Sequence, residues 1–123
     1  MILFDKLYTI TSVEASVASV CYKIHLNPDH AIYQAHFPGE PITPGACIVQ
    51  IAQELASMWQ QCELEIAKII NLKFLSVIKP EEVLDLDIIL EIKKDDENGI
   101  QLRGSFVKGD TEYTKMSLLC HRV

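Results

Sequence analysis

A single amphipathic stretch beginning near residue 44 most constrains how this chain can fold. Its apolar residues recur at helical spacing, at Ile48, Ile51, Ala52, Leu55 and Trp59. Thr43 is predicted to cap the helix, and Pro44 suits its first turn, where a missing N–H costs nothing. The pattern fades near Gln61 without a glycine or proline to stop it. The sequence therefore predicts one long helix, and it must bury its apolar stripe against something else.

The rest of the chain has mostly the signature of strands. Apolar residues alternate clearly in residues 17–26 and 83–92, and three further strands are predicted over residues 69–78, 100–107 and 112–121. Residues 94–99 end in Asn-Gly and predict a hairpin turn, and residues 108–110 predict another turn. The predicted order is two extended segments, the helix and then four strands.

These elements predict an α+β fold in which one helix packs on one face of a strongly curved, largely antiparallel sheet. We expect residues 1–123 to form a single domain. The strand faces that point away from the helix carry more apolar residues than a sheet face in contact with solvent usually does. We therefore expect part of that surface to meet another copy of the chain. The residues concerned are Ile69, Leu75, Val77, Val83, Ile89, Val107 and Leu119.

Composition narrows the class of protein. The chain has 123 residues, 49% of them hydrophobic, and a formal net charge of −6. The acidic balance and the lack of a basic run argue against nucleic acid as a partner, and no stretch reaches the length of a membrane span. The first residues do not resemble a signal peptide, and the four cysteines lack C-x-x-C spacing. We expect a cytoplasmic protein with reduced thiols and no metal site.

Residues 36–45 carry the strongest functional signal: His-Phe-Pro-Gly-Glu-Pro-Ile-Thr-Pro-Gly. This segment places His36 on a proline-stiffened loop just ahead of the helix N-terminus. Imidazole is a base near neutral pH. The first N–H groups of a helix have no internal partner, so they can stabilise a developing negative charge. The alternative is a structural histidine that hydrogen-bonds the loop backbone.

The pattern H-F-P-G-x-P-x-x-P-G opening a helix resembles the 3-hydroxyacyl-acyl-carrier-protein dehydratases of the FabZ type. The order of elements over nearly the whole chain is similar too. The resemblance implies a hotdog fold, in which an antiparallel sheet wraps a central helix, and an obligate dimer that sometimes assembles further. It also implies loss of water from a 3-hydroxyacyl thioester carried on the phosphopantetheine of acyl carrier protein, with no other cofactor.

The same resemblance implies roles for individual residues. His36 corresponds to the catalytic histidine, and Gly45 to the glycine whose backbone binds the thioester carbonyl, with Phe37 and Pro44 beside them as substrate-binding residues. A glycine at position 45 would also let the substrate approach the backbone closely. In such dimers the site lies between the subunits, and the acid comes from the helix of the opposite one.

The chain departs from the family at that acid. Five residues after Gly45 the family has a glutamate or aspartate, whereas this chain has Gln50, whose amide cannot supply a proton. Glu54 follows on the same helix face, where the family often has glutamine. We hypothesise that Glu54 replaces the usual acid; the alternatives are a surface carboxylate at Glu54 and an interface amide at Gln50. Ala35 also replaces a glycine, which would strain the loop if that position needs a positive φ.

Three functions follow from this reading. The leading one is a 3-hydroxyacyl-acyl-carrier-protein dehydratase of fatty-acid, polyene or related synthesis, with His36, Gln50 and Glu54 as catalytic residues. The second is a half-catalytic or non-catalytic subunit that pairs with a related chain carrying the missing acid. The third is a thioesterase, because the hotdog fold hosts thioesterases as well and a fold does not decide chemistry.

Overall fold

The computed structural model describes all residues from 1 to 123. Six strands form one sheet in the order β1-β2-β4-β5-β6-β3, and every neighbouring pair is antiparallel. Two helices precede β3. The elements are β1 (Tyr8–Ala15), β2 (Ser19–Leu26), α1 (Ile32–Ala35), α2 (Gly45–Gln60), β3 (Leu64–Phe74), β4 (Asp85–Asp96), β5 (Gly99–Lys108) and β6 (Thr111–Arg122).

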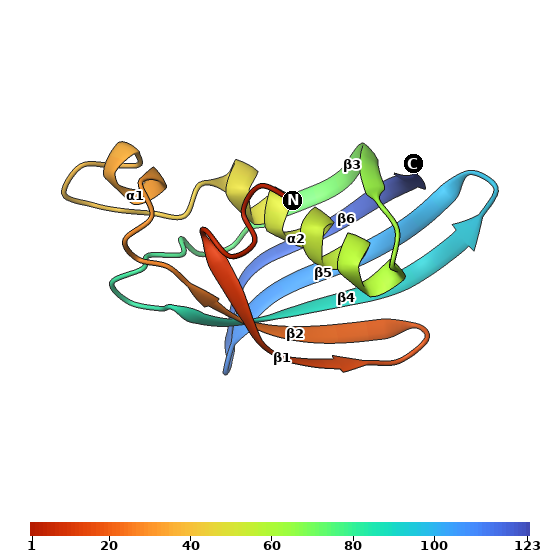
Figure 1. Ribbon diagram of the computed structural model, residues 1–123, viewed down its shortest axis with the longest axis horizontal. Coiled ribbons are helices and arrows are strands. Elements are labelled where there is room, and N and C mark those ends of the chain that lie inside the picture. The colour runs from red at the N-terminus through yellow and green to blue at the C-terminus, as the bar shows by residue number, and fades with distance from the viewer.

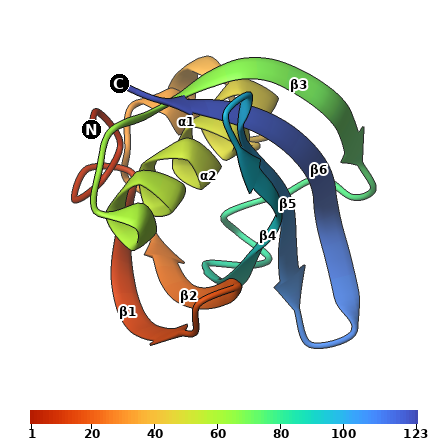
Figure 2. The ribbon, with the colours of Figure 1, turned by 90° about the vertical axis from the view of Figure 1, so that its right-hand side faces the viewer.

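The long helix α2 lies in the hollow of the curved sheet, and its axis crosses the strands (Figure 1). Seen from the side, the sheet curls around α2, with β1 and β3 at its two edges (Figure 2). The predicted α+β architecture is confirmed. The helix residues that face the sheet are buried, namely Ile48, Ile51, Ala52, Leu55 and Ala56.

The alternation predicted for two of the strands is confirmed. In β2 the buried residues are Val20, Tyr22, Ile24 and Leu26. In β4, Leu86, Ile88 and Leu90 are buried in the same way. Register pairs Tyr22 with Ile88, so the two apolar rows lie side by side beneath α2.

The prediction for β3 is wrong at both ends, because the strand runs from Leu64 to Phe74 rather than over residues 69–78. Two register shifts, between Ile66 and Lys68 and between Ile69 and Asn71, interrupt its alternation. After Phe74 the chain leaves the sheet and crosses to the loop before α2, where the Ile78 carbonyl accepts a hydrogen bond from the Thr43 N–H at 2.8 Å.

Other predicted boundaries also need correction. The turn expected over residues 94–99 is shorter, because β4 continues to Asp96 and only Glu97 and Asn98 lie outside the strands. Asp96 Oδ1 accepts the Asn98 N–H at 2.8 Å, and Gly99 follows with φ of 124°. Val83, expected on an outer face, is buried in the core.

Thr43 does not cap α2. The N-cap is Pro44, and no side chain donates or accepts a capping bond there. The Thr43 hydroxyl instead hydrogen-bonds the Tyr33 hydroxyl at 2.9 Å, and both residues are buried. Thr43 therefore joins the short helix α1, which the sequence did not predict, to the start of α2.

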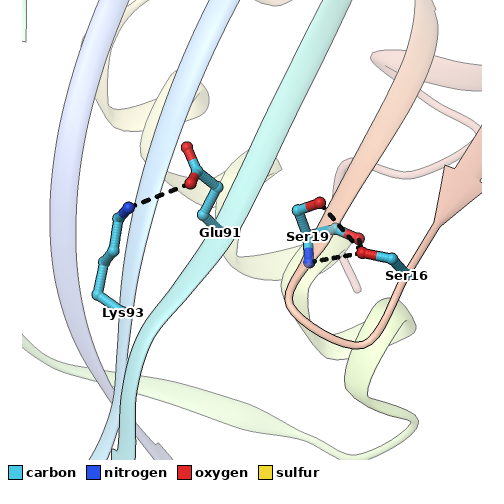
Figure 3. Close-up of polar contacts among 4 residues, drawn as sticks. All are labelled: Ser16, Ser19, Glu91 and Lys93. Atoms are coloured by element: carbon cyan, nitrogen blue, oxygen red, sulfur yellow. Dashed lines mark hydrogen bonds and ion pairs between the residues drawn. The ribbon is translucent and has the colours of Figure 1, made fainter.

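At the other end of the molecule the β1–β2 hairpin is closed by Ser16 and Ser19, whose hydroxyls lie 3.2 Å apart (Figure 3). Register places Ser19 opposite Glu91 of β4, and Lys93 Nζ donates to Glu91 Oε2 at 3.1 Å. These contacts are exposed, so each contributes little to the stability of the fold.

The edge strand β3 and the segment after it expose a row of apolar side chains. Ile69, Ile70, Phe74, Leu75 and Val77 are each 44–53% exposed. An unpaired strand edge with apolar neighbours is the kind of surface that pairs with another chain. Neither helix of the structure is long and apolar enough to cross a membrane.

Candidate functional site

His36 is held by its backbone at the end of α1, of which it is the C-cap. Its N–H donates to the Ile32 carbonyl at 3.0 Å, and its carbonyl accepts from the Ile42 N–H at 2.7 Å. The half-buried ring lies against Phe37, with ring centroids 5.4 Å apart. Neither ring nitrogen hydrogen-bonds another residue of the chain. The alternative of an imidazole satisfied by loop backbone therefore does not describe this structure.

The alanine before His36 causes no strain. Ala35 is the last residue of α1, and the only non-glycine residues with positive φ are Asp5 and Gln61. A right-handed helical turn accepts alanine readily. The short helix thus removes the need for glycine at this position.

Gly45 begins α2 directly after the N-cap Pro44. The Pro44 carbonyl accepts from the N–H groups of Cys47 and Ile48, at 3.0 and 3.1 Å. The N–H groups of Gly45 and Ala46 have no acceptor within the chain. Two unpaired donors therefore stand at the positive end of the helix dipole, where they can bind an oxygen that carries negative charge.

The Phe74 ring lies directly over Gly45. A Cβ atom added at Gly45 would be 2.6 Å from Phe74 Cζ, which is closer than real contacts allow. Phe74 comes from the end of β3 and is 53% exposed. Sequence reasoning missed this residue, because its approach to Gly45 depends on where β3 ends.

A mostly apolar cavity of about 300 Å³ opens beside Gly45 and Phe74. Its other lining residues come from the α2 start and from the segment after β3: Ile42, Thr43, Ile48, Leu75, Ser76, Val77 and Ile78. The cavity joins an apolar lining to the free amides at the helix start. That combination suits an acyl chain that ends in a polar carbonyl group.

Glu54 lies on α2 at the centre of a hydrogen-bond cluster and is 2% exposed. Its Oε2 accepts from the N–H groups of Ile2 and Leu3, both at 3.1 Å, and from Gln50 Nε2 at 2.8 Å. Its Oε1 accepts from the Phe4 N–H at 2.9 Å and from the Tyr8 hydroxyl at 3.1 Å. Five donors thus converge on one carboxylate, and they tie the N-terminal segment to α2.

These contacts decide the charge of Glu54. Burial acts to raise the pKa of its carboxyl group, but the hydrogen bonds from Gln50, Leu3, Tyr8 and Ile2 outweigh it and lower the pKa below the usual glutamate value. Burial, followed by the Glu54 charge, raises the pKa of Tyr8 far above its usual value, so that hydroxyl stays protonated. Glu54 is therefore an ionised acceptor in this structure.

Gln50 and Glu54 line a second cavity, of about 620 Å³, between α2 and the N-terminal residues. It shares no residue with the cavity beside Gly45, and His36 lines neither. One chain therefore brings Gly45 and Phe74 together, and Gln50 and Glu54 together. It does not bring the two pairs into one cavity.

Comparison with known proteins agrees with this architecture. A curved antiparallel sheet wrapped around one helix is a hotdog fold, and the structure resembles the dehydratase heterocomplex ApeI:P from Xenorhabdus doucetiae with a TM-score of 0.75. That match covers 93% of this chain and 97% of the other, at 16% identity. A thioesterase superfamily protein from Shewanella loihica also matches, with a TM-score of 0.62, 12% identity and coverage of 91% and 90%. Because both matches are distant in sequence, they establish the fold alone.

The sequence itself identifies the family. Residues 12–113 match the ApeI-like family, described as ApeI dehydratase, and the chain belongs to it. Among its relatives is the 3-hydroxyacyl-[acyl-carrier-protein] dehydratase FabZ of Lactobacillus helveticus, 30% identical over 83 residues. That match covers 62% of this chain and 55% of the relative, so the chain spans little more than half of that protein. The FabZ of Latilactobacillus sakei is 24% identical over 77% of this chain and 70% of its own length.

Proposed function

We propose that this chain eliminates water from a 3-hydroxyacyl thioester carried by acyl carrier protein, giving a 2-enoyl thioester. The observation that supports this most strongly is the pair of unpaired amides at Gly45 and Ala46, which follows the loop that holds His36. Membership of a dehydratase family supports the same chemistry. The setting we propose is cytoplasmic fatty-acid, polyene or related acyl-chain synthesis, in which the four free cysteines stay reduced.

The proposed reaction begins at the carbon next to the thioester. Neutral His36 removes a proton from C2, and the charge that develops on the thioester oxygen is stabilised by the amides near Gly45. The C3–O bond then breaks as the C2–C3 double bond forms. The leaving hydroxyl needs a proton, and Gln50 has none to give. The imidazolium of His36 returns the proton it took, so water leaves and the base is regenerated.

A second subunit completes the site in this proposal. Gln50 and Gly45 line separate cavities within one chain, so the group that contacts the hydroxyl is expected to come from a partner. The exposed apolar edge of β3 is the surface we propose for that pairing. Ile70→Lys introduces a charge on this edge. It should shift the protein from dimer towards monomer in analytical ultracentrifugation and lower turnover with it.

A related second chain is the alternative partner. One observation favours it: this chain carries Gln50 where the resemblance calls for an acid, in an otherwise intact motif. The structurally similar ApeI:P protein is itself a heterocomplex. If the purified chain alone dehydrates its substrate at a rate typical of dehydratases, this alternative is excluded.

The deciding experiment is mass spectrometry of a 3-hydroxyacyl-carrier substrate incubated with the wild type and with three variants: His36→Ala, Gln50→Glu and Glu54→Gln. An enoyl product that disappears in His36→Ala supports dehydration, whereas release of free acid would support a thioesterase. An unchanged rate in Glu54→Gln would end the hypothesis that Glu54 is the acid. Of the two residues, the geometry favours Gln50 as the one that faces the hydroxyl, because Glu54 is buried and ionised.

Gln50→Glu tests the missing acid directly. The new carboxyl group would lie close to the Glu54 carboxylate, since the present Nε2–Oε2 distance is 2.8 Å. Two carboxylates that close share a proton, which raises the pKa of one of them and keeps it protonated nearer neutral pH. A positioned general acid contributes roughly 10²–10⁴-fold. We therefore expect Gln50→Glu to raise kcat, with the gain lost as pH rises and that shared proton dissociates.

A further inference from the structure

The contact between Gln50 and Glu54 fixes which end of the Gln50 amide points where. An ionised carboxylate has only acceptors, so the group 2.8 Å from Glu54 Oε2 must be the amide nitrogen. The opposite orientation would set two acceptor oxygens against each other. Chemistry therefore determines the orientation of this amide.

Glu54 cannot turn to release this constraint. Four other donors hold its two oxygens, and three of them are backbone N–H groups of residues 2–4. The fourth is the Tyr8 hydroxyl, which itself is completely buried. The carboxylate is thus a fixed acceptor, and the Gln50 amide is ordered by it.

The other end of the amide is free. Gln50 Oε1 hydrogen-bonds no atom of the chain, and the half-buried side chain lines the cavity of about 620 Å³. A carbonyl oxygen at that position accepts a hydrogen bond and cannot donate one. It can therefore distinguish a ligand with a hydroxyl from one with only a carbonyl.

We propose that Glu54 is a positioning residue that keeps the Gln50 carboxamide oxygen turned outward, where it accepts a hydrogen bond from the substrate's 3-hydroxyl. The inference rests on the proposed function, and it adds a basis for specificity. The site selects 3-hydroxyacyl chains over 3-oxoacyl chains, because a 3-oxo group would set one unpaired acceptor against another.

The test compares two ligands that cannot react. A 3-hydroxyacyl and a 3-oxoacyl pantetheine amide of the same chain length are titrated into the assembled wild-type protein by calorimetry. We expect the hydroxyl ligand to bind about tenfold more tightly, which is the effect of one hydrogen bond made or left unmade. Gln50→Leu should bring the ratio close to one, and Glu54→Leu should lower it, because the Gln50 amide nitrogen then has no acceptor at position 54 to fix its orientation.

Tyr8→Phe is the matched control. It removes one donor from Glu54 Oε1 but leaves the Gln50 bond to Oε2 intact. It should lower stability without changing the ligand ratio. An unchanged ratio in Gln50→Leu would overturn the inference, and so would a Tyr8→Phe variant whose ratio falls as far as that of Glu54→Leu.

A second readout needs no ligand. The side-chain NH₂ resonances of Gln50, identified by their absence in Gln50→Leu, should shift in NMR spectra as acid protonates Glu54. If they do not shift, the amide orientation is wrong. If they shift but the wild type forms no enoyl product and binds neither ligand, the proposed function fails while the orientation stands.

Discussion

Glu54→Gln should destabilise the protein far more than an exposed glutamate would, because five donors lose an ionised acceptor. The glutamine side chain at position 54 has only one oxygen. The least costly orientation keeps this oxygen at the position of Oε2, where it still accepts from Ile2, Leu3 and Gln50. The amide nitrogen then replaces Oε1. The Tyr8 hydroxyl can rotate to accept from it, but the Phe4 N–H is left facing a donor.

The magnitude follows from those losses. An unmade hydrogen bond at Phe4 costs about 1–3 kcal/mol, and the remaining bonds lose the charge that roughly doubles their strength. We expect a total loss of about 3 kcal/mol at pH 7. With a urea m-value of about 1.5 kcal/mol/M, the unfolding midpoint should fall by about 2 M. The matched control is Glu91→Gln, which breaks only the exposed pair with Lys93 and should cost no more than about 0.5 kcal/mol.

The effect should also depend on pH in a definite direction. The pKa of Glu54 is lowered in the folded state, so its contribution is complete above the ordinary glutamate pKa of about 4.3 and is lost as pH falls through the folded value. The gap between wild type and Glu54→Gln should therefore be largest at pH 7 and shrink on acidification. Urea titrations at one protein concentration and several pH values measure it. A loss no greater than that of Glu91→Gln, or a gap that stays constant down to pH 3, would refute the reasoning.

Three further predictions concern other sites. The Thr114 hydroxyl is completely buried with no partner, so Thr114→Val should stabilise the protein by about 1 kcal/mol and raise Tm by several degrees. Thr43→Val should lower Tm, since the Tyr33 hydroxyl loses its partner. If Thr114→Val lowers Tm as Thr43→Val does, the reasoning about the unpaired Thr114 hydroxyl is wrong. In Gly45→Ala the added methyl group should push the Phe74 ring across the free amides at the start of α2. We expect kcat/KM to fall by about 10²-fold. Adding Phe74→Ala should restore most of the activity, and no recovery would mean that the ring is not responsible.

The sequence predicted those helices and strands whose apolar residues follow a regular spacing within the element itself. The apolar positions of α2 recur at helical spacing, and those of β2 and β4 alternate without interruption, so each period reveals which face is buried. In β3 two register shifts break the alternation, and the pattern of the sequence no longer follows the sheet. The apolar run after Phe74 looks like more strand, but the Ile78 carbonyl pairs with Thr43 instead of a neighbouring strand.

The candidate site divides in the same way. The motif predicts free amides at the start of the helix, and the structure has them at Gly45 and Ala46. It also predicts His36 beside them, but His36 lines neither cavity of the single chain, so that part stays a prediction. The environment of Glu54 was not predictable, since four of its five donors come from residues 2–8, about fifty positions earlier, and three of these four are backbone groups that any sequence carries. A carboxylate on a helix face is usually solvated. Here the N-terminal segment folds over it, so the residue that spacing alone suggests as an acid is held as a base. In the function we propose, the Gln50 amide takes the place of the family's acid. The burial and ionisation of Glu54, and not the change of residue at position 50 alone, are what orient that amide.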